Sequence, residues 1–92
     1  MKIFIIEDEI PALENLKMCL AGIESNIEIA GAASSVAQSL NWLRNNPMPD
    51  IILMDIQLSD GLSFHILKED NIKCPVIFIT AYDKYMVDAF EY

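Results

Sequence analysis

Four short apolar runs alternate along the chain with segments of helical spacing. The runs cover residues 3–6, 27–33, 51–54 and 76–79, and polar residues bound each of them. Runs of this length that are rich in β-branched and aromatic residues are typical of strands buried on both faces of a parallel sheet. We therefore predict a strand at each of the four positions.

Segments with apolar residues at intervals of three and four follow each run. Pro11 suits the first turn of the first helix, and Ser34 or Ser35 can cap the second. Asp60-Gly61 marks a turn before the third segment. The predicted helices span residues 11–20, 36–44, 62–70 and 84–90.

This alternation predicts an α/β fold, a doubly wound parallel sheet with right-handed crossovers and helices on both faces. With 92 residues the chain forms one domain, residues 1–92. It ends where a fold of this kind would enter another strand. We therefore expect the last strand and its helix to be missing and the edge of the fourth strand to be bare.

The composition narrows the class of function. Hydrophobic residues make up 53% of the chain, which favours a packed core, and the net charge of -8 repels nucleic-acid phosphates and anionic lipids. We expect no direct nucleic-acid binding and no membrane association. The first apolar run is too short for a signal peptide or a membrane span, and Cys19 and Cys74 stand apart from any CxxC pair. These features predict buried or half-buried free thiols in a reducing cytoplasm.

Candidate chemistry gathers where the predicted strands end. Glu7, Asp8 and Glu9 follow the first strand, Asp55 ends the third and Thr80 ends the fourth. Ligands of open α/β sheets bind at the carboxyl ends of the strands, and neighbouring strands lie only about 5 Å apart. Carboxylates crowded in this way repel one another and raise at least one pKa. A divalent cation relieves the repulsion, and oxygen ligands favour Mg²⁺ or Mn²⁺ over zinc.

A carboxylate beside a bound cation can attack phosphorus and form an aspartyl phosphate. Asp55 is the best candidate nucleophile because it ends the most buried strand, and the Thr80 hydroxyl can donate to phosphoryl oxygens. Each residue also has a simpler interpretation. Residues 7–9 can be an acidic turn at a helix start, Asp55 can cap a turn, and Thr80 can cap the last helix. Their joint position at three of four strand ends favours the metal-dependent site.

Three segments, IIEDE, PDIILMDIQLSDG and PVIFITAYDKY, resemble the receiver domain of bacterial two-component response regulators. The resemblance covers the whole chain and implies a flavodoxin-like, CheY-like receiver fold that lacks its last strand and helix. By position, Asp55 matches the phosphoacceptor, and Glu7 and Asp8 match the acidic pair that organises Mg²⁺. Gln57 matches the residue whose backbone carbonyl completes the metal shell.

The resemblance also implies a switch. Thr80 matches the hydroxyl that moves toward the phosphoryl group, and Ala81 matches the small residue beside it. A histidine kinase would donate the phosphoryl group, and the face around the fourth strand and last helix would then rearrange. The segments DIQLSDG and TAYDKYMVDAFEY are similar to receivers joined to LytTR-type DNA-binding domains, which implies an output domain beyond Tyr92 that regulates transcription. A homodimer through the last helix or the bare strand edge is expected.

The chain departs from the family pattern in three places. Ser59 stands where a proline is usual and Ser63 where a glycine is usual, so we expect a changed loop conformation with the site retained. The third departure is the missing fifth strand, which in the family carries the pocket lysine and the aromatic switch residue. Lys84 cannot be assumed to substitute for that lysine. We therefore expect the chain to bind Mg²⁺ but to respond poorly to phosphorylation.

Two other classes of function remain open from the sequence. A small Mg²⁺-dependent aspartyl-phosphate phosphatase or phosphotransferase also places an Asp at a strand end. Such enzymes favour a second Asp two residues later as general acid, whereas this chain has Gln57, which cannot protonate a leaving group. A degenerate protein-interaction module that pairs through its strand edge or last helix is the other alternative.

Overall fold

The computed structural model describes residues 1–23, 26–79 and 89–91. The first part of the chain forms strand β1 (Lys2–Ile6), helix α1 (Ile10–Ala21), strand β2 (Glu28–Ala33), helix α2 (Val36–Asn45) and strand β3 (Ile51–Asp55). The second part forms strands β4 (Gln57–Leu58) and β5 (Gly61–Leu62), helix α3 (Phe64–Glu69) and strands β6 (Val76–Ile79) and β7 (Ala89–Glu91).

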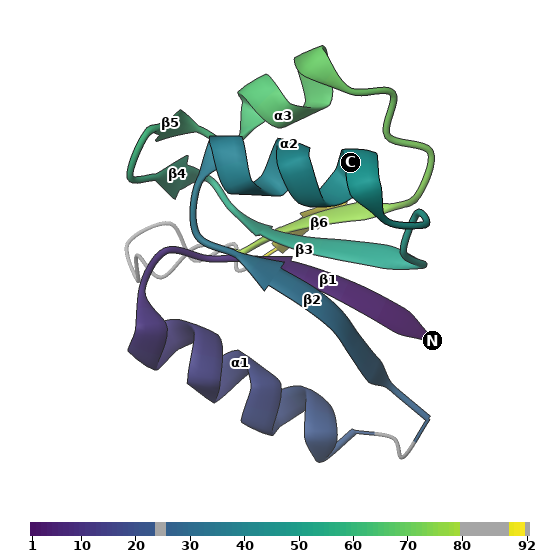
Figure 1. Ribbon diagram of the computed structural model, residues 1–92. Helices are drawn as coiled ribbons and strands as arrows, with labels where there is room; N and C mark the ends of the chain where they lie inside the picture. Colours follow the sequence, from purple (N-terminus) through teal and green to yellow (C-terminus); the bar gives the residue numbers. More distant parts are fainter. Residues whose placement is uncertain (24–25, 80–88, 92) are drawn as a thin grey trace.

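The main sheet has the strand order β2-β1-β3-β6-β7, and its first four strands are parallel. Figure 1 shows α1 on one face of this sheet and α2 and α3 on the other. The doubly wound α/β prediction is therefore confirmed. The strand order reverses next to β1 and β3, which is the place where doubly wound sheets of the flavodoxin-like order bind ligands. None of the described helices has the length and apolar character needed to span a membrane.

Apart from Lys2 at the start of β1 and Asp55 at the end of β3, the central strands are apolar, and both of their faces pack against other parts of the fold. In β1, Ile3 and Ile5 pack in the α1 layer, whereas Phe4 and Ile6 pack on the α2 and α3 side. Strands β3 and β6 divide their side chains between the two layers in the same way. Burial on both sides stabilises these strands by the hydrophobic effect and leaves their ends fixed in position.

The helix boundaries follow local signals. Ser35 caps α2, as the sequence predicted, and its Oγ accepts a hydrogen bond of 3.0 Å from the N–H of Gln38. Helix α1 has Pro11 in its first turn. Helix α3 is shorter than predicted because Leu62 lies in β5 and the helix starts only at Phe64.

The prediction of a helix over residues 84–90 is wrong at its end. Residues 89–91 form β7, which runs antiparallel to β6 with Phe90 opposite Phe78, and residues 80–88 lie outside the described part. The pairing gives partners to backbone groups along β6 that would otherwise be an open sheet edge. The expectation of a bare edge is therefore also wrong, and dimerisation through that edge loses its basis. A contact through the predicted last helix falls outside the described residues.

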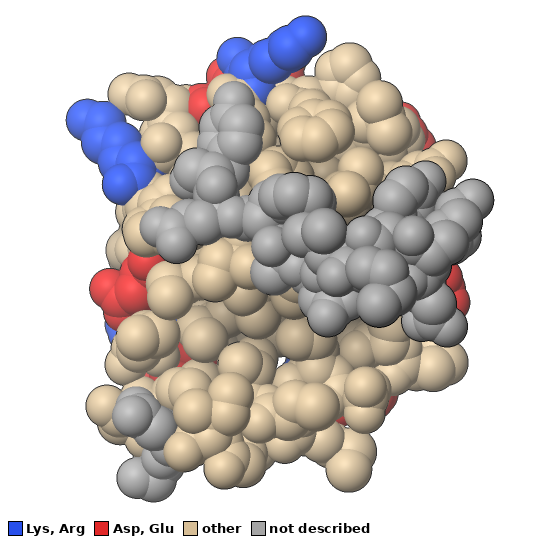
Figure 2. All heavy atoms as spheres, turned by 180° about the vertical axis from the view of Figure 1, so that it is seen from behind, with Lys and Arg blue, Asp and Glu red and all other residues tan. Residues whose placement is uncertain are grey.

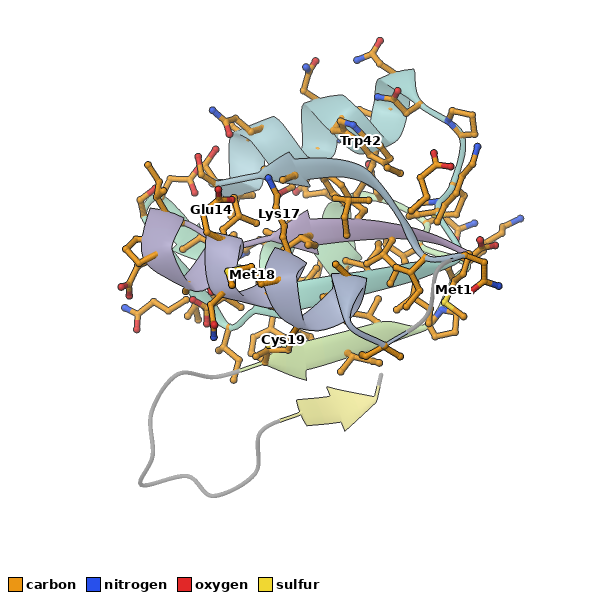
Figure 3. All side chains as sticks on the ribbon, turned by 90° about the horizontal axis from the view of Figure 1, so that it is seen from below. Met1, Glu14, Lys17, Met18, Cys19 and Trp42 are labelled. Carbon is orange, nitrogen blue, oxygen red and sulfur yellow. The ribbon has the colours of Figure 1, made fainter. Side chains whose placement is uncertain are left out.

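Both cysteines are free thiols. Cys74 is half-buried, as predicted, but Cys19 is exposed. Figure 3 looks onto the outer side of α1, where Cys19 and Met18 lie on the same helix as Glu14 and Lys17, whose charged groups are 3.5 Å apart. The prediction failed for Cys19 because the leucines of α1 already supply the side that packs on the sheet.

A close contact between α2 and the sheet requires a glycine in β2. The register between β1 and β2 shifts after Ile3, so that Phe4 pairs with Gly31. The ring of Trp42 stacks on Phe4 with centroids 4.0 Å apart and planes at 10°. A Cβ atom at Gly31 would lie 2.4 Å from Nε1 of Trp42, which is too short for any real contact. Any side chain at this position therefore displaces the tryptophan.

We predict that Gly31→Ala lowers the free energy of unfolding in urea by about 1–3 kcal/mol, because the added methyl overpacks the Trp42 contact. Gly22→Ala is the matched control. Gly22 has a helical φ of −83°, and a Cβ there would meet nothing closer than the Cys19 carbonyl at 3.6 Å. That change should alter stability by less than about 1 kcal/mol. Equal losses in the two variants would contradict the packing account.

Candidate metal centre

Three carboxyl groups meet at the carboxyl ends of β1 and β3. Glu7 and Asp8 directly follow β1, and Asp55 is the last residue of β3. The two strands are parallel neighbours. One oxygen from each carboxyl group lies within 4.8 Å of those of the other two. The predicted gathering is confirmed for Glu7, Asp8 and Asp55, whereas Glu9 is exposed and is not part of this cluster. Thr80 and Ala81 lie outside the described residues.

Backbone hydrogen bonds fix the acids in place. The N–H of Glu7 donates to the Ala33 carbonyl at 2.9 Å, which extends the pairing of β1 with β2 by one residue. Oδ1 of Asp55 accepts from the N–H of Ile56 at 2.8 Å, and Oε2 of Glu7 accepts from the N–H of Glu9 at 3.2 Å. The Glu7 side chain is buried, and Asp8 and Asp55 are half-buried.

Burial and mutual repulsion raise the pKa values in this cluster. Burial raises the pKa of Glu7 to about 7, the N–H of Glu9 opposes this, and the charge of Asp55 adds to it. Burial also raises the pKa of Asp55, with the Ile56 N–H opposing and the charge of Asp8 adding. The direction agrees with the raised pKa that the sequence predicted, but burial is a larger cause than the repulsion between the carboxylates. The cluster therefore carries negative charge only at a cost in free energy.

The described ion pairs do not supply positive charge to the cluster. They join Arg44 to Asp70 at 3.1 Å and Lys17 to Glu14. On the face shown in Figure 2, the blue Lys and Arg side chains lie at the margin of the molecule and form no continuous basic patch among the described residues. Among the described residues, the ion pairs thus leave the charge of the three acids uncompensated.

The donor set fits a hard divalent cation. Glu7, Asp8 and Asp55 each offer a carboxylate oxygen, and the cluster contains neither Cys nor His. Such all-oxygen sites suit Mg²⁺ or Mn²⁺ and disfavour zinc. Gln57 lies in β4, two residues beyond Asp55, with an exposed side chain. Its backbone carbonyl as a further ligand stays a prediction.

The chain after Asp55 forms a hairpin that the sequence did not reveal. Strands β4 and β5 pair antiparallel around a turn that contains Ser59 and Asp60, and Gly61 has a φ of 145°, which favours glycine. Ser63 is fully buried, and both its N–H and its Oγ donate to the Ile56 carbonyl, at 2.9 and 3.0 Å. The serine that departs from the family pattern thus closes the base of the loop.

Sequence reasoning also missed Asp60. The Asp60-Gly61 pair indicated the turn, but nothing nearby in the sequence shows that the Asp60 carboxylate accepts hydrogen bonds from the N–H groups of Val36 and Ala37 in α2. The contact spans 23 and 24 residues of chain. Only the assembled fold shows it.

Several known proteins are similar to this chain in sequence. The chain is 39% identical over 94 residues to the sensory transduction protein LytT of Bacillus anthracis and 32% identical over 93 residues to the transcriptional regulatory protein BtsR of Escherichia coli K12. These matches cover 99% of the chain but only 37% and 38% of the two relatives. The chain thus spans well under half the length of these curated relatives.

Solved structures of similar sequence have the same fold as this chain. The response regulatory domain of the protein mrkE from Klebsiella pneumoniae is 31% identical with a TM-score of 0.73, and the match covers 95% of this chain and 72% of that one. The response regulator PhyR from Brucella abortus is 31% identical with a TM-score of 0.74 over 94% of this chain and 35% of that one. The family model described as the response regulator receiver domain matches residues 3–92. The chain therefore belongs to the family of response regulator receiver domains.

Proposed function

We propose that the chain is a phosphoacceptor switch in which Asp55 takes a phosphoryl group from a sensor histidine kinase. The observation that carries the proposal is the approach of three carboxylate oxygens within 4.8 Å at the end of a buried strand. Glu7, Asp8, Asp55 and the backbone carbonyl of Gln57 would hold Mg²⁺, with Mn²⁺ as a substitute. The family membership of the chain supports the same assignment.

The geometry of Asp55 suits nucleophilic attack. The Ile56 N–H engages Oδ1 at 2.8 Å and so fixes the plane of the carboxylate. A carboxylate oxygen attacks phosphorus, the bond from phosphorus to the kinase imidazole nitrogen breaks, and that nitrogen keeps the electron pair. A bound cation would lower the repulsion between the incoming phosphoryl oxygens and the acids. Glu7 and Asp8 hold it by their charge and take no covalent part.

Protons and the cation compete for the same oxygens. The pKa of Glu7 is raised to about 7, so this carboxyl is largely protonated in mildly acidic solution when no cation is bound. Binding of a divalent cation requires the charged form and therefore releases a proton. Affinity for the cation should rise with pH through neutrality for this reason.

We assign the remaining residues of the switch by their match to the receiver family. In this proposal the Thr80 hydroxyl and the small Ala81 respond to the phosphoryl group, and the face around β6 changes shape. The full-length protein would then control an output domain beyond Tyr92, of the DNA-binding LytTR type, in the cytoplasm. The names of the relatives LytT and BtsR, a sensory transduction protein and a transcriptional regulatory protein, support this. We also propose self-association through the predicted last helix, whose residues 84–88 lie outside the described part of the chain.

Replacement of the nucleophile gives the first test. Asp55→Asn should abolish labelling of the chain by acetyl phosphate, because an amide oxygen does not form the acyl phosphate. Wild-type labelling should be slow and should require Mg²⁺. Intact-protein mass spectrometry measures both. Glu14→Gln, an exposed acid on α1, should label like the wild type. Labelling of Asp55→Asn at the wild-type level would contradict the assignment.

The raised pKa of Glu7 gives a second test. With EDTA present, the free energy of unfolding should fall by about 1–3 kcal/mol between about pH 5 and pH 8, because the folded protein binds a proton that the unfolded chain releases. The sign follows from a folded pKa of about 7 above the ordinary 4.5: stability present below pH 4.5 is lost as pH rises through about 7.

Urea titrations at each pH measure this slope, and Glu7→Gln should flatten it. Excess MgCl₂ should restore the stability of the wild type at the upper end of the range and leave Glu7→Gln almost unchanged. If the wild type and Glu7→Gln show the same pH dependence in EDTA, Glu7 is not the group that titrates.

A further inference from the structure

The tip of the β4–β5 hairpin contacts the N-terminus of α2 through one side chain. Oδ1 of Asp60 accepts from the N–H of Val36 at 2.7 Å, and Oδ2 accepts from the N–H of Ala37 at 3.2 Å. Helix N-termini leave such N–H groups without partners inside the helix. Asp60 therefore caps a helix to which it does not belong.

Two further N–H groups at this helix end have local partners. The N–H of Gln38 donates to Ser35 Oγ at 3.0 Å, and the Gln38 side chain in turn accepts from the N–H of Ser34 at 3.0 Å. The N-terminus of α2 is thus capped both by Ser35, a local residue, and by Asp60, a residue distant in sequence. The hydrogen bond from Val36 lowers the pKa of Asp60, and the positive end of the helix dipole favours its charged form.

The hairpin is held at a second point near its base. Ser63 is fully buried and donates two hydrogen bonds to the Ile56 carbonyl, directly after Asp55. Between this base and the tip at Asp60 lies Gln57, whose own side chain is exposed. Its backbone position is therefore set by the two anchors and by the neighbouring Leu58, which is 4% exposed in the core.

We infer that Asp60 is a positioning residue that holds the β4–β5 hairpin, and with it the backbone of Gln57, against the N-terminus of α2. The consequence for cation binding rests on the proposed function, because Gln57 is the residue whose carbonyl would face the cation. Groups that hold metal ligands in place affect metal affinity without touching the metal. Asp60 thus joins the loop of the phosphoacceptor to a helix on one face of the sheet.

The chain offers a matched pair of variants. Asp60→Ala removes the acceptor for Val36 and Ala37, whereas Ser35→Ala removes the acceptor for Gln38 at the same helix end. Both variants take away a cap of α2, but only the first releases the hairpin. Asp60→Asn keeps one acceptor oxygen without the charge, so its effects should fall between those of the wild type and Asp60→Ala.

Amide hydrogen exchange of the 92-residue chain by NMR reports the coupling directly. Asp60→Ala should reduce protection at Val36 and Ala37 and also at Ser63, on the far side of the hairpin. Ser35→Ala should reduce protection at Gln38 and leave Ser63 unchanged. If Asp60→Ala leaves the exchange at Ser63 at the wild-type rate, Asp60 is only a helix cap and the inference is overturned.

Titration calorimetry with MgCl₂ tests the consequence for the site. Asp60→Ala should bind Mg²⁺ about tenfold more weakly than the wild type, with Ser35→Ala within about twofold of it. Equal affinity in Asp60→Ala and Ser35→Ala would overturn the link to the cation. If the wild type itself binds no Mg²⁺, the proposed function fails, and the Ser63 exchange result alone decides the positioning role.

Discussion

The repulsion among three carboxylates at the ends of β1 and β3 is the constraint on which the rest of this structure depends. Acids within 4.8 Å of one another, one of them buried, stay together only because the pairing of two central strands holds them there. Burial and proximity together raise the pKa values of Glu7 and Asp55. The fold thus holds the carboxylates in an electrostatically unfavourable arrangement. Binding of a proton or of a divalent cation can relieve it, and the two compete for the same oxygens.

The fold supports this constraint from both faces of the sheet and from the loop beyond it. Ile5 and Phe4 place the layers of α1 and α2 on opposite sides of β1, so the strand end cannot shift to separate the acids. The hairpin after Asp55 is closed at its base by Ser63 and attached at its tip to α2 by Asp60. Asp55 therefore lies between a buried strand and a loop with two anchors.

Much of this could be predicted from the sequence because periodicity and strand ends are local features. Alternating runs gave the four parallel strands, and Glu7, Asp8 and Asp55 followed from the rule that parallel strands end at one edge. Ser35 was identified as a possible cap for the same reason. The contact of Asp60 with α2 could not be predicted, since two elements far apart in sequence create it. The exposure of Cys19 and the pairing of β7 with β6 likewise depend on which surfaces the assembled fold has already covered.

Paramagnetic relaxation by Mn²⁺ tests most directly whether the strand-end acids form one cation site. Mn²⁺ broadens the NMR signals of nearby amides, and it is a close substitute for Mg²⁺ at oxygen ligands. Substoichiometric Mn²⁺ should first broaden the amides of Glu7, Asp8, Asp55 and Gln57, and excess Mg²⁺ should restore them. Broadening that is centred instead on other acids, such as Glu69 and Asp70 at the end of α3, would contradict the account.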